Sequence, residues 1–241
     1  MPRLTHLGGA FIFIFQRAMQ LAAIIWDWNG TLLDDVDYAL GCMNQLLARR
    51  EMPLLDRDRY RRIFGFPVEK YYRRLGFDFR TEPFDEVSRE FIEDYYAGLS
   101  VPTPQTGAQE LVRDLDAAGI TQCILSAMEI EPLRYQLEIN GFLEVMKYVQ
   151  GLNHSHATSK VAEGKALLRQ LGLSRGRVLF VGDTTHDLEV AQTMGLEALI
   201  LAHGHQEIIG KGYGPHMVCR DLEELRNVLG SRYGVHWRTG S

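Results

Sequence analysis

The sequence predicts an α/β fold in which a parallel sheet is covered by helices on both faces. Three observations support this prediction. Residues 22–26 form an apolar run of the length expected for a buried strand. From residue 107 onward, short apolar runs alternate with amphipathic segments, and repeated strand–helix units imply a parallel sheet. Residues 34–100 show helical periodicity without an evident strand, so we expect a helical insertion just after the first strand.

The first strand ends at a turn that carries polar side chains. The apolar run stops at Asp27, and the turn-forming pair Asn29-Gly30 follows. A carboxylate placed where a core strand meets a glycine turn is exposed at the edge of the sheet. In open α/β sheets this edge is the usual place for a ligand.

The insertion reads as a run of helices. Apolar residues recur at helical spacing from Val36 to Leu47, Met52-Pro53 ends that helix, and Gly65-Phe66-Pro67 separates two shorter ones. We expect helices over 34–50, 56–64, 67–75 and 83–99. Residues 101–104, with two prolines, then form a stiff extended connector.

The second half of the chain alternates between helices and strands. We expect helices over 107–118, 130–140, 161–171, 186–194 and 221–229. We expect strands over 121–126, 148–152, 178–181, 197–202 and 217–219. The chain therefore divides into a leader over 1–20, a core domain over 21–33 and 101–232, and a helical domain over 34–100.

Composition narrows the classes of partner. The 241 residues, 46% of them hydrophobic, can form one well-buried domain or a core with a smaller insert. The net charge of −5 and the lack of a long basic block give no evidence for nucleic acid as a partner. The three cysteines are scattered, without metal-type spacing, and their odd number argues against a disulfide framework. This fits a reducing compartment and hence the cytoplasm. The sequence does not indicate an oligomeric state.

The leader differs in character from the rest of the chain. The apolar run over 11–15 is too short to span a bilayer, so we expect no membrane association. A signal peptide is conceivable, but no clear small-residue cleavage site follows. We favour a start at Met19, with the preceding residues disordered or misassigned.

Polar residues follow several of the predicted strands. They are, in chain order, Asp27, Asn29, Thr31, Ser126, Lys160, Asp183 and Asp187. Parallel strands bring their carboxyl ends to one edge of the sheet. Three carboxylates close together cannot all stay ionised cheaply without a cation, and Mg²⁺ prefers such hard oxygen ligands. We therefore expect a Mg²⁺ site that also binds a small phosphorylated substrate.

These motifs resemble the haloacid dehalogenase-like (HAD) hydrolase superfamily. The resemblance covers residues 21–229 and includes four motifs in the family's order: Asp27-Trp-Asn-Gly-Thr31-Leu, Ile124-Leu125-Ser126, Lys160 before a helix, and Gly182-Asp183-Thr-Thr-His-Asp187. It implies a Rossmannoid core with an inserted helical cap of the C1 type. The cap and spacing look most like the phosphoglycolate phosphatase and β-phosphoglucomutase branch.

The resemblance also implies roles. Asp27 would attack phosphorus and form an aspartyl-phosphate. Asp27, the backbone carbonyl of Asn29, Asp183 and Asp187 would hold Mg²⁺. Thr31 and Ser126 would donate hydrogen bonds to phosphoryl oxygens, and Lys160 would offset negative charge. We choose Lys160 over Lys165 because Lys165 falls within the predicted helix 161–171.

Further residues are candidates for binding the substrate. Gly30 and Ala127 stand beside the motif residues, and Arg62 and Lys70 come from the cap. Arginine forks suit a carboxylate or phosphate, whereas a solvated helix face is the alternative for these cap residues.

Asn29 departs from the family's phosphatases, which have an aspartate two residues after the nucleophile. The family's aspartate protonates the leaving group and then activates water, but an amide has no titratable proton. Loss of a general acid–base typically lowers a rate by about 10²–10⁴-fold. The departure therefore affects the expected turnover and leaves the expected metal and phosphate binding in place.

Three interpretations remain open. The first is a phosphatase that is slow or that borrows another acid, for which His186 and His154 are candidates. The second is a phosphonatase-like C–P hydrolase with Lys70 as a Schiff-base lysine. The third is a phospho-ligand sensor without turnover. We favour Mg²⁺-dependent hydrolysis of a small phosphomonoester through Asp27.

Overall fold

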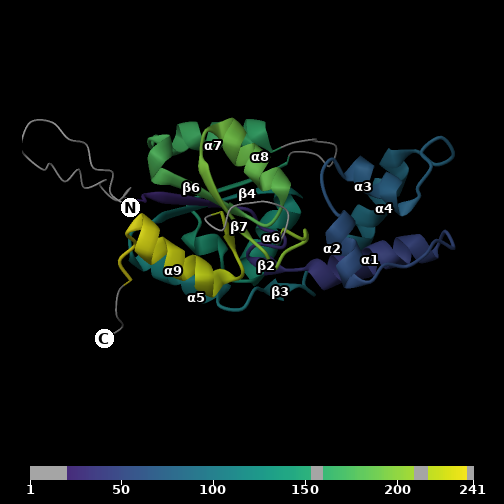
Figure 1. Ribbon diagram of the computed structural model, residues 1–241, viewed down its shortest axis with the longest axis horizontal. Coiled ribbons are helices and arrows are strands. Elements are labelled where there is room, and N and C mark those ends of the chain that lie inside the picture. The colour runs from purple at the N-terminus through teal and green to yellow at the C-terminus, as the bar shows by residue number, and fades with distance from the viewer. Residues whose placement is uncertain (1–20, 153–159, 209–216, 238–241) are drawn as a thin grey trace, which may run out of the picture.

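The computed structural model describes residues 21–152, 160–208 and 217–237 (Figure 1). The expectations for the leader and for His154 lie outside these residues. The described chain forms a six-stranded parallel sheet in the order β5-β4-β1-β6-β7-β8. Its strands are β1 (Ala23–Trp26), β4 (Thr121–Glu129), β5 (Tyr148–Leu152), β6 (Val178–Gly182), β7 (Glu197–Leu201) and β8 (Val218–Cys219). The predicted α/β fold with a parallel sheet is confirmed.

Helices cover both faces of this sheet because alternate residues of each strand point to opposite sides. On β1, Ile24 and Trp26 pack on one side, and Ala23 and Ile25 on the other. The first side is covered by α5 (Ala108–Ala117), α6 (Ile130–Ile139) and α9 (Leu222–Tyr233). The second side is covered by α7 (Val161–Leu171) and α8 (Thr185–Met194).

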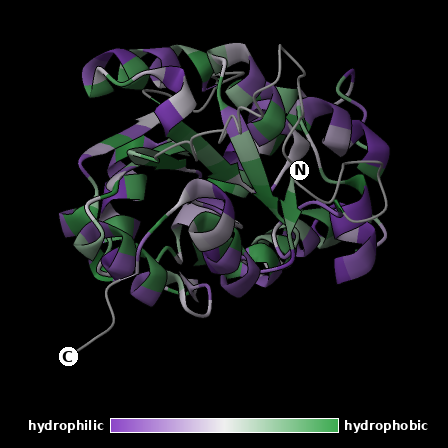
Figure 2. Cartoon of the chain, turned by 60° about the vertical axis from the view of Figure 1, so that its left-hand side comes forward, coloured by the Kyte–Doolittle hydropathy of each residue, from purple (hydrophilic) through white to green (hydrophobic). Residues whose placement is uncertain are grey.

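Short 3₁₀ turns form at η1 (Leu143–Val145) and η2 (Arg175–Arg177). Figure 2 shows largely hydrophobic strands between helices whose outward faces are hydrophilic.

The helices of the insertion gather at one end of the molecule, beside the sheet (Figure 1). They are α1 (Val36–Ala48), α2 (Arg57–Ile63), α3 (Val68–Leu75) and α4 (Phe84–Tyr96). These four helices, called the helical group below, enclose a separate cluster of buried apolar side chains. Their ends follow from the sequence: Asp56 caps α2 by accepting the Arg59 amide at 2.6 Å, and α3 ends at Gly76 with φ of 108°.

Two expectations for the insertion were wrong, and the smaller difference is that the helix predicted over 83–99 ends at Tyr96. The helix predicted over 34–50 begins at Val36, because Asp34 lies in a short strand, β2 (Leu33–Asp34). This strand pairs antiparallel with β3 (Thr103–Pro104), within the predicted connector. The Asp35 side chain makes no cap for α1 and instead accepts the backbone amide of Gly30. The two segments that connect the sheet with the helical group are thus paired side by side.

Two boundaries in the second half differ by more than one residue. The strand predicted to end at Ser126 runs on to Glu129 after a register shift beyond Leu125, and the last helix runs on to Tyr233. No helix in the described ranges is long and apolar enough to cross a bilayer.

Candidate active site

The site begins where two paired strands end. The amide of Asp27 donates to the carbonyl of Val181 on β6 at 2.8 Å, so sheet pairing continues to the first residue after β1. Asp183 directly follows Gly182, the last residue of β6. Because β1 and β6 are neighbours, the two carboxyl groups lie side by side at the carboxyl edge of the sheet.

Asp187 completes a group of three buried acids. Asp27, Asp183 and Asp187 each offer a carboxylate oxygen, and these oxygens lie within 4.8 Å of one another. Asp187 stands in the first turn of α8, where its Oδ2 accepts the Thr184 amide at 2.9 Å and the Thr184 hydroxyl at 2.8 Å. This capping box orients the carboxylate and turns its other oxygen toward the site.

Lys160 supplies positive charge to two of these acids. Its Nζ lies 2.5 Å from Oδ1 of Asp27 and 2.8 Å from Oδ1 of Asp187. Lys160 precedes α7, and only 2% of its surface is exposed. Lys165, the rejected candidate, is exposed on α7.

The charges in this group are not balanced by the protein alone. Burial raises the pKa of Asp27 to about 6, although Lys160 opposes the shift. Burial also raises the pKa of Asp183 well above its usual value, and Asp187 and Asp27 add to the shift. Burial would raise the pKa of Asp187 too, but Lys160 outweighs it and the net shift is downward. One ammonium against three carboxylates leaves an excess of negative charge that fits a divalent cation bound through oxygens.

Glycines let the backbone close around Asp183. A Cβ atom on Gly30 would lie 2.3 Å from Oδ2 of Asp183, and one on Gly204 would lie 2.2 Å from it. The amide of His205 donates to the same oxygen at 2.6 Å. Gly30 also has φ of 70°, a left-handed conformation that favours glycine. The carboxylate of Asp183 is therefore held in one position by backbone on two sides.

The predicted hydroxyl residues reach the same edge. The Thr31 hydroxyl donates to Oδ1 of Asp183 at 3.4 Å, and Ser126 lines the cavity above the acids while its Oγ accepts the Met128 amide at 3.1 Å. Ala127 also lines this cavity. The backbone amide of Gly30 is bound to Asp35, and among the described residues neither Gly30 nor Thr31 lines the cavity.

Asn29 points toward the helical group. Its Nδ2 lies 2.9 Å from Oδ2 of Asp35 and 2.8 Å from the hydroxyl of Tyr95 on α4. Its amide nitrogen is thus committed to two oxygens, one of them from the helical group. An amide can hold this position but cannot exchange a proton there.

Sequence reasoning missed the role of Asp35 and His205. Asp35 accepts hydrogen bonds from Gly30, Asn29, Tyr95 and Nε2 of His205, the last at 3.1 Å. The other ring nitrogen of His205 lies 2.8 Å from the hydroxyl of Tyr60 on α2. Although burial opposes the charged form, Asp35 and the nearby acids raise the pKa of His205 to about 9. No spacing pattern in the sequence predicts this contact, since the two residues are separated by 170 positions.

Two of the predicted cap residues lie elsewhere. Arg62 and Lys70 are exposed and are not among the described residues that line the cavity. Their placement supports neither a substrate clamp nor a Schiff-base lysine. His186 does line the cavity, where its ring stacks on Phe66 at a centroid distance of 4.5 Å.

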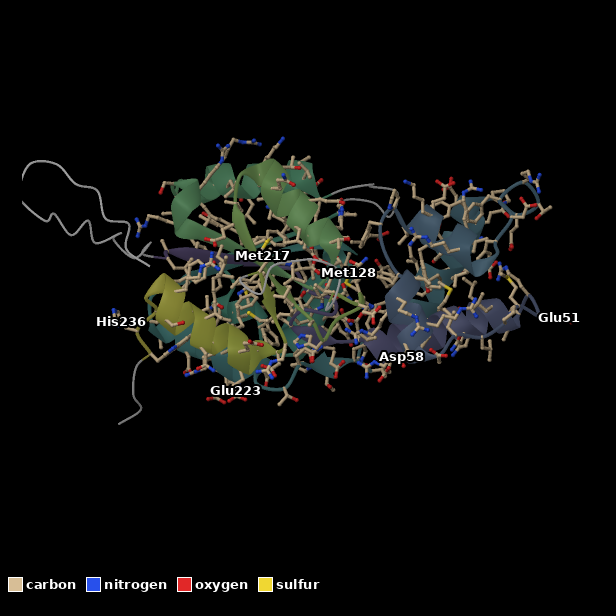
Figure 3. The ribbon with its side chains drawn as sticks, viewed as in Figure 1. Glu51, Asp58, Met128, Met217, Glu223 and His236 are labelled. Carbon is tan, nitrogen blue, oxygen red and sulfur yellow. The ribbon has the colours of Figure 1, made fainter. Side chains whose placement is uncertain are left out.

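The cavity itself lies between the sheet and the helical group. It has a volume of about 220 Å³ and reaches from the three acids to aromatic residues of α2 and α4. Met128, which lines it, is labelled in Figure 3 between the two parts of the molecule. Arg61 of α2 donates from Nε to the carbonyl of Gly204 at 2.8 Å, so the loop that contains His205 bonds directly to the helical group.

Comparison with known proteins shows the family to which the chain belongs. The family model described as haloacid dehalogenase-like hydrolase matches residues 24–201, and the chain belongs to this family. It is similar to an N-acetylmuramic acid 6-phosphate phosphatase from Pseudomonas aeruginosa, with 25% identity over 88% of this chain and 96% of that protein. It is also similar to a phosphoglycolate phosphatase from Rhodospirillum rubrum, with 26% identity over 86% of this chain and 90% of that protein. The solved structure of protein tyrosine kinase A from Mycobacterium tuberculosis shares the fold, with a TM-score of 0.74, 23% identity and coverage of 88% and 99%. The predicted family and the hydrolase class are confirmed.

Proposed function

We propose that this chain is a phosphomonoester phosphatase that acts on a small phosphorylated metabolite and uses Asp27 as its nucleophile. The observation that carries the proposal is the buried group of three acids with Lys160 bonded to two of them. Two similar curated proteins are named as phosphatases, which supports the same reaction class. Phosphoryl transfer depends on positioning and charge stabilisation, and this group provides both.

The proposed metal is Mg²⁺. Asp27, the backbone carbonyl of Asn29, Asp183 and Asp187 would hold it, and when bound it supplies positive charge beside the phosphoryl oxygens. The excess of buried negative charge and the all-oxygen donor set fit this ion.

The proposed chemistry has two half-reactions. A carboxylate oxygen of Asp27 attacks phosphorus, the bond from phosphorus to the leaving oxygen breaks, and that oxygen takes a proton from solvent. Water then attacks phosphorus of the aspartyl-phosphate, which returns the carboxylate and releases phosphate and a proton. Lys160 stays bonded to Asp27 and offsets charge, while the hydroxyls of Thr31 and Ser126 donate to phosphoryl oxygens.

Asn29 determines the rate of hydrolysis that we expect. Because its amide cannot donate a titratable proton, the leaving group must be protonated by another source. We therefore propose slow turnover, or turnover limited to substrates with good leaving groups.

We propose that the helical group forms a cap over the core. Residues 34–100 carry it, the paired strands β2 and β3 join it to the core, and Tyr60 and Tyr95 reach the site from it. A cap that opens and closes would admit substrate and then exclude water. We also propose a cytoplasmic location, which is supported by three free, buried cysteines.

Asn29 also favours a second candidate, a phospho-ligand-binding protein without turnover. Its amide is committed to Asp35 and Tyr95, so it leaves no proton donor at that position. This protein would bind a phosphate analogue such as beryllofluoride but hydrolyse no member of a broad phosphate-ester panel.

The deciding experiment measures hydrolysis of p-nitrophenyl phosphate and of that panel with Mg²⁺. We expect wild-type turnover and its loss in Asp27→Asn. Asp58→Asn serves as control, because Asp58, labelled in Figure 3, is exposed on α2 and does not line the cavity. Equal rates for wild type and Asp27→Asn would remove the proposed mechanism.

A further inference from the structure

The cavity above Asp27 has two ends of different chemistry. The inner end holds the acids and Lys160. The outer end is formed by apolar side chains that come from the helical group and from β4: Phe64, Phe66, Val68, Phe91, Ile92 and Met128. A phosphoryl group seated at Asp27 would therefore carry its leaving group into an apolar chamber.

Positive charge is confined to the inner end. Among the described residues that line the cavity, Lys160 is the one lysine or arginine, and it is already bonded to Asp27 and Asp187. Glu129 adds a carboxylate to the outer lining. A negatively charged leaving group would lose its hydration there and gain no cationic partner, which is unfavourable.

The arginines of the helical group face other partners. The guanidinium of Arg61 donates to the backbone carbonyl of Gly204, and Arg73 pairs with Glu69 at 2.6 Å. Arg62 is exposed outside the lining. None of these three therefore offers a fork to a substrate carboxylate inside the cavity.

The two histidines of the lining are also engaged. His205 lies between Asp35 and the Tyr60 hydroxyl. His186 stacks its ring on Phe66 and has Nδ1 3.5 Å from Glu189. Stacked rings and apolar walls favour a leaving group with an aromatic or branched aliphatic body.

We infer that the substrate is the phosphate ester of an uncharged alcohol whose body is aromatic or branched aliphatic. The inference rests on the proposed phosphatase function and adds the class of leaving group. It excludes esters whose leaving group carries a carboxylate as preferred substrates, because the described lining beyond the acids offers apolar side chains, tyrosines and the Glu129 carboxylate but no lysine or arginine.

A matched pair of substrates tests this directly. 4-Methylphenyl phosphate and 4-carboxyphenyl phosphate both have a phenolic leaving group, as the proposed function allows; they share the same reacting bond and nearly the same shape, and they differ in one charge. With Mg²⁺ present, we expect kcat/KM to be higher for the methyl compound by about tenfold or more, since burying an unpaired carboxylate is costly.

A charge added to the outer lining should reverse part of this preference. Val68 lines the cavity and is 36% exposed at the start of α3, so Val68→Lys should fold normally. We expect it to shift the kcat/KM ratio toward the carboxy compound by about tenfold. Val101→Lys is the matched control, because Val101 is 61% exposed and is outside the lining; its ratio should match wild type.

The outcomes separate the two proposals. If p-nitrophenyl phosphate is hydrolysed, three results overturn the inference alone. They are equal kcat/KM for the methyl and carboxy compounds, a higher kcat/KM for the carboxy compound, and no turnover of the methyl compound. An unchanged ratio in Val68→Lys also overturns it. Loss of all turnover, p-nitrophenyl phosphate included, overturns the phosphatase function and the inference with it.

Discussion

The carboxylate of Asp35 lies 3.1 Å from Nε2 of His205, and this contact joins the start of α1 to the loop after β7. The same carboxylate accepts the hydroxyl of Tyr95 at 2.7 Å, and the histidine reaches the hydroxyl of Tyr60. Asp35 and His205 therefore bond the core to the helical group at two points. The pair also borders the acids, since the His205 amide donates to Asp183.

The first prediction concerns Asp35→Asn. Asparagine has one acceptor oxygen, and its NH₂ would face hydrogen-bond donors, so a buried His205 would lose its charged partner. We expect the free energy of unfolding to fall by about 3 kcal/mol, measured by urea denaturation.

Asp37→Asn is the control for this measurement. Asp37 lies in the first turn of α1, two residues after Asp35, and pairs with Arg57 in an exposed salt bridge, which contributes little to stability. A loss as small for Asp35→Asn as for Asp37→Asn would show that the Asp35 contacts do not stabilise the folded protein.

The second prediction concerns Asn29→Asp, which restores the residue type of the family's phosphatases. If the missing acid limits the rate, turnover of an ester with a poor leaving group should rise by about 10²-fold or more. The new carboxyl group would stand beside Asp35, and this neighbour favours its protonated form. Steady-state kinetics on an alkyl phosphate is the measurement.

Asn29→Ala separates chemistry from the loss of the amide contacts. It removes the bonds to Asp35 and Tyr95 without adding an acid, so it should show no gain. A rate that stays flat in Asn29→Asp would mean that the proton comes from elsewhere or that chemistry is not the slow step.

Much of this arrangement was predictable because it follows from strand order. Asp27 and Asp183 each follow a buried strand, and parallel strands end at one edge, so their meeting required no knowledge of side chains. Lys160 was identified because it directly precedes a helix whose apolar periodicity was clear. The roles of these residues in catalysis stay predictions.

The remaining features depend on the faces that helices present after packing. On α3 the residues Tyr71, Tyr72 and Leu75 are buried, which turns Lys70 to solvent. Periodicity located this helix but did not say which neighbour its apolar face would meet. The pairing of Asp35 with His205 depends in the same way on the docking of distant elements.

The third prediction concerns removal of the metal. Three buried carboxylates that share one ammonium should repel one another, so Mg²⁺ should raise the melting temperature and EDTA should lower it. At a Mg²⁺ concentration 100 times the dissociation constant, the stabilisation should be about 2.7 kcal/mol. Differential scanning fluorimetry across a Mg²⁺ series gives the shift.

Asp183→Asn should weaken this response, because it removes one proposed ligand charge. Glu223→Gln, an exposed change on α9, should keep the wild-type shift (Figure 3). A Mg²⁺ response that is the same in both variants would exclude Asp183 as a ligand.

The fourth prediction uses the close approach of Gly204 to Asp183. An alanine Cβ at position 204 would lie 2.2 Å from Oδ2 and 2.3 Å from Cβ of Asp183, so the carboxylate would have to move. Because a displaced ligand binds metal less well, we expect Gly204→Ala to weaken Mg²⁺ binding by about 10–100-fold, measured by calorimetric titration.

Gly41→Ala is the matched glycine control. A Cβ there meets nothing within 4 Å, and the change removes a glycine from the interior of α1, so it should stabilise the protein by about 1 kcal/mol and leave Mg²⁺ affinity unchanged. Wild-type Mg²⁺ affinity in Gly204→Ala would mean that the position of Asp183 is not set by this contact.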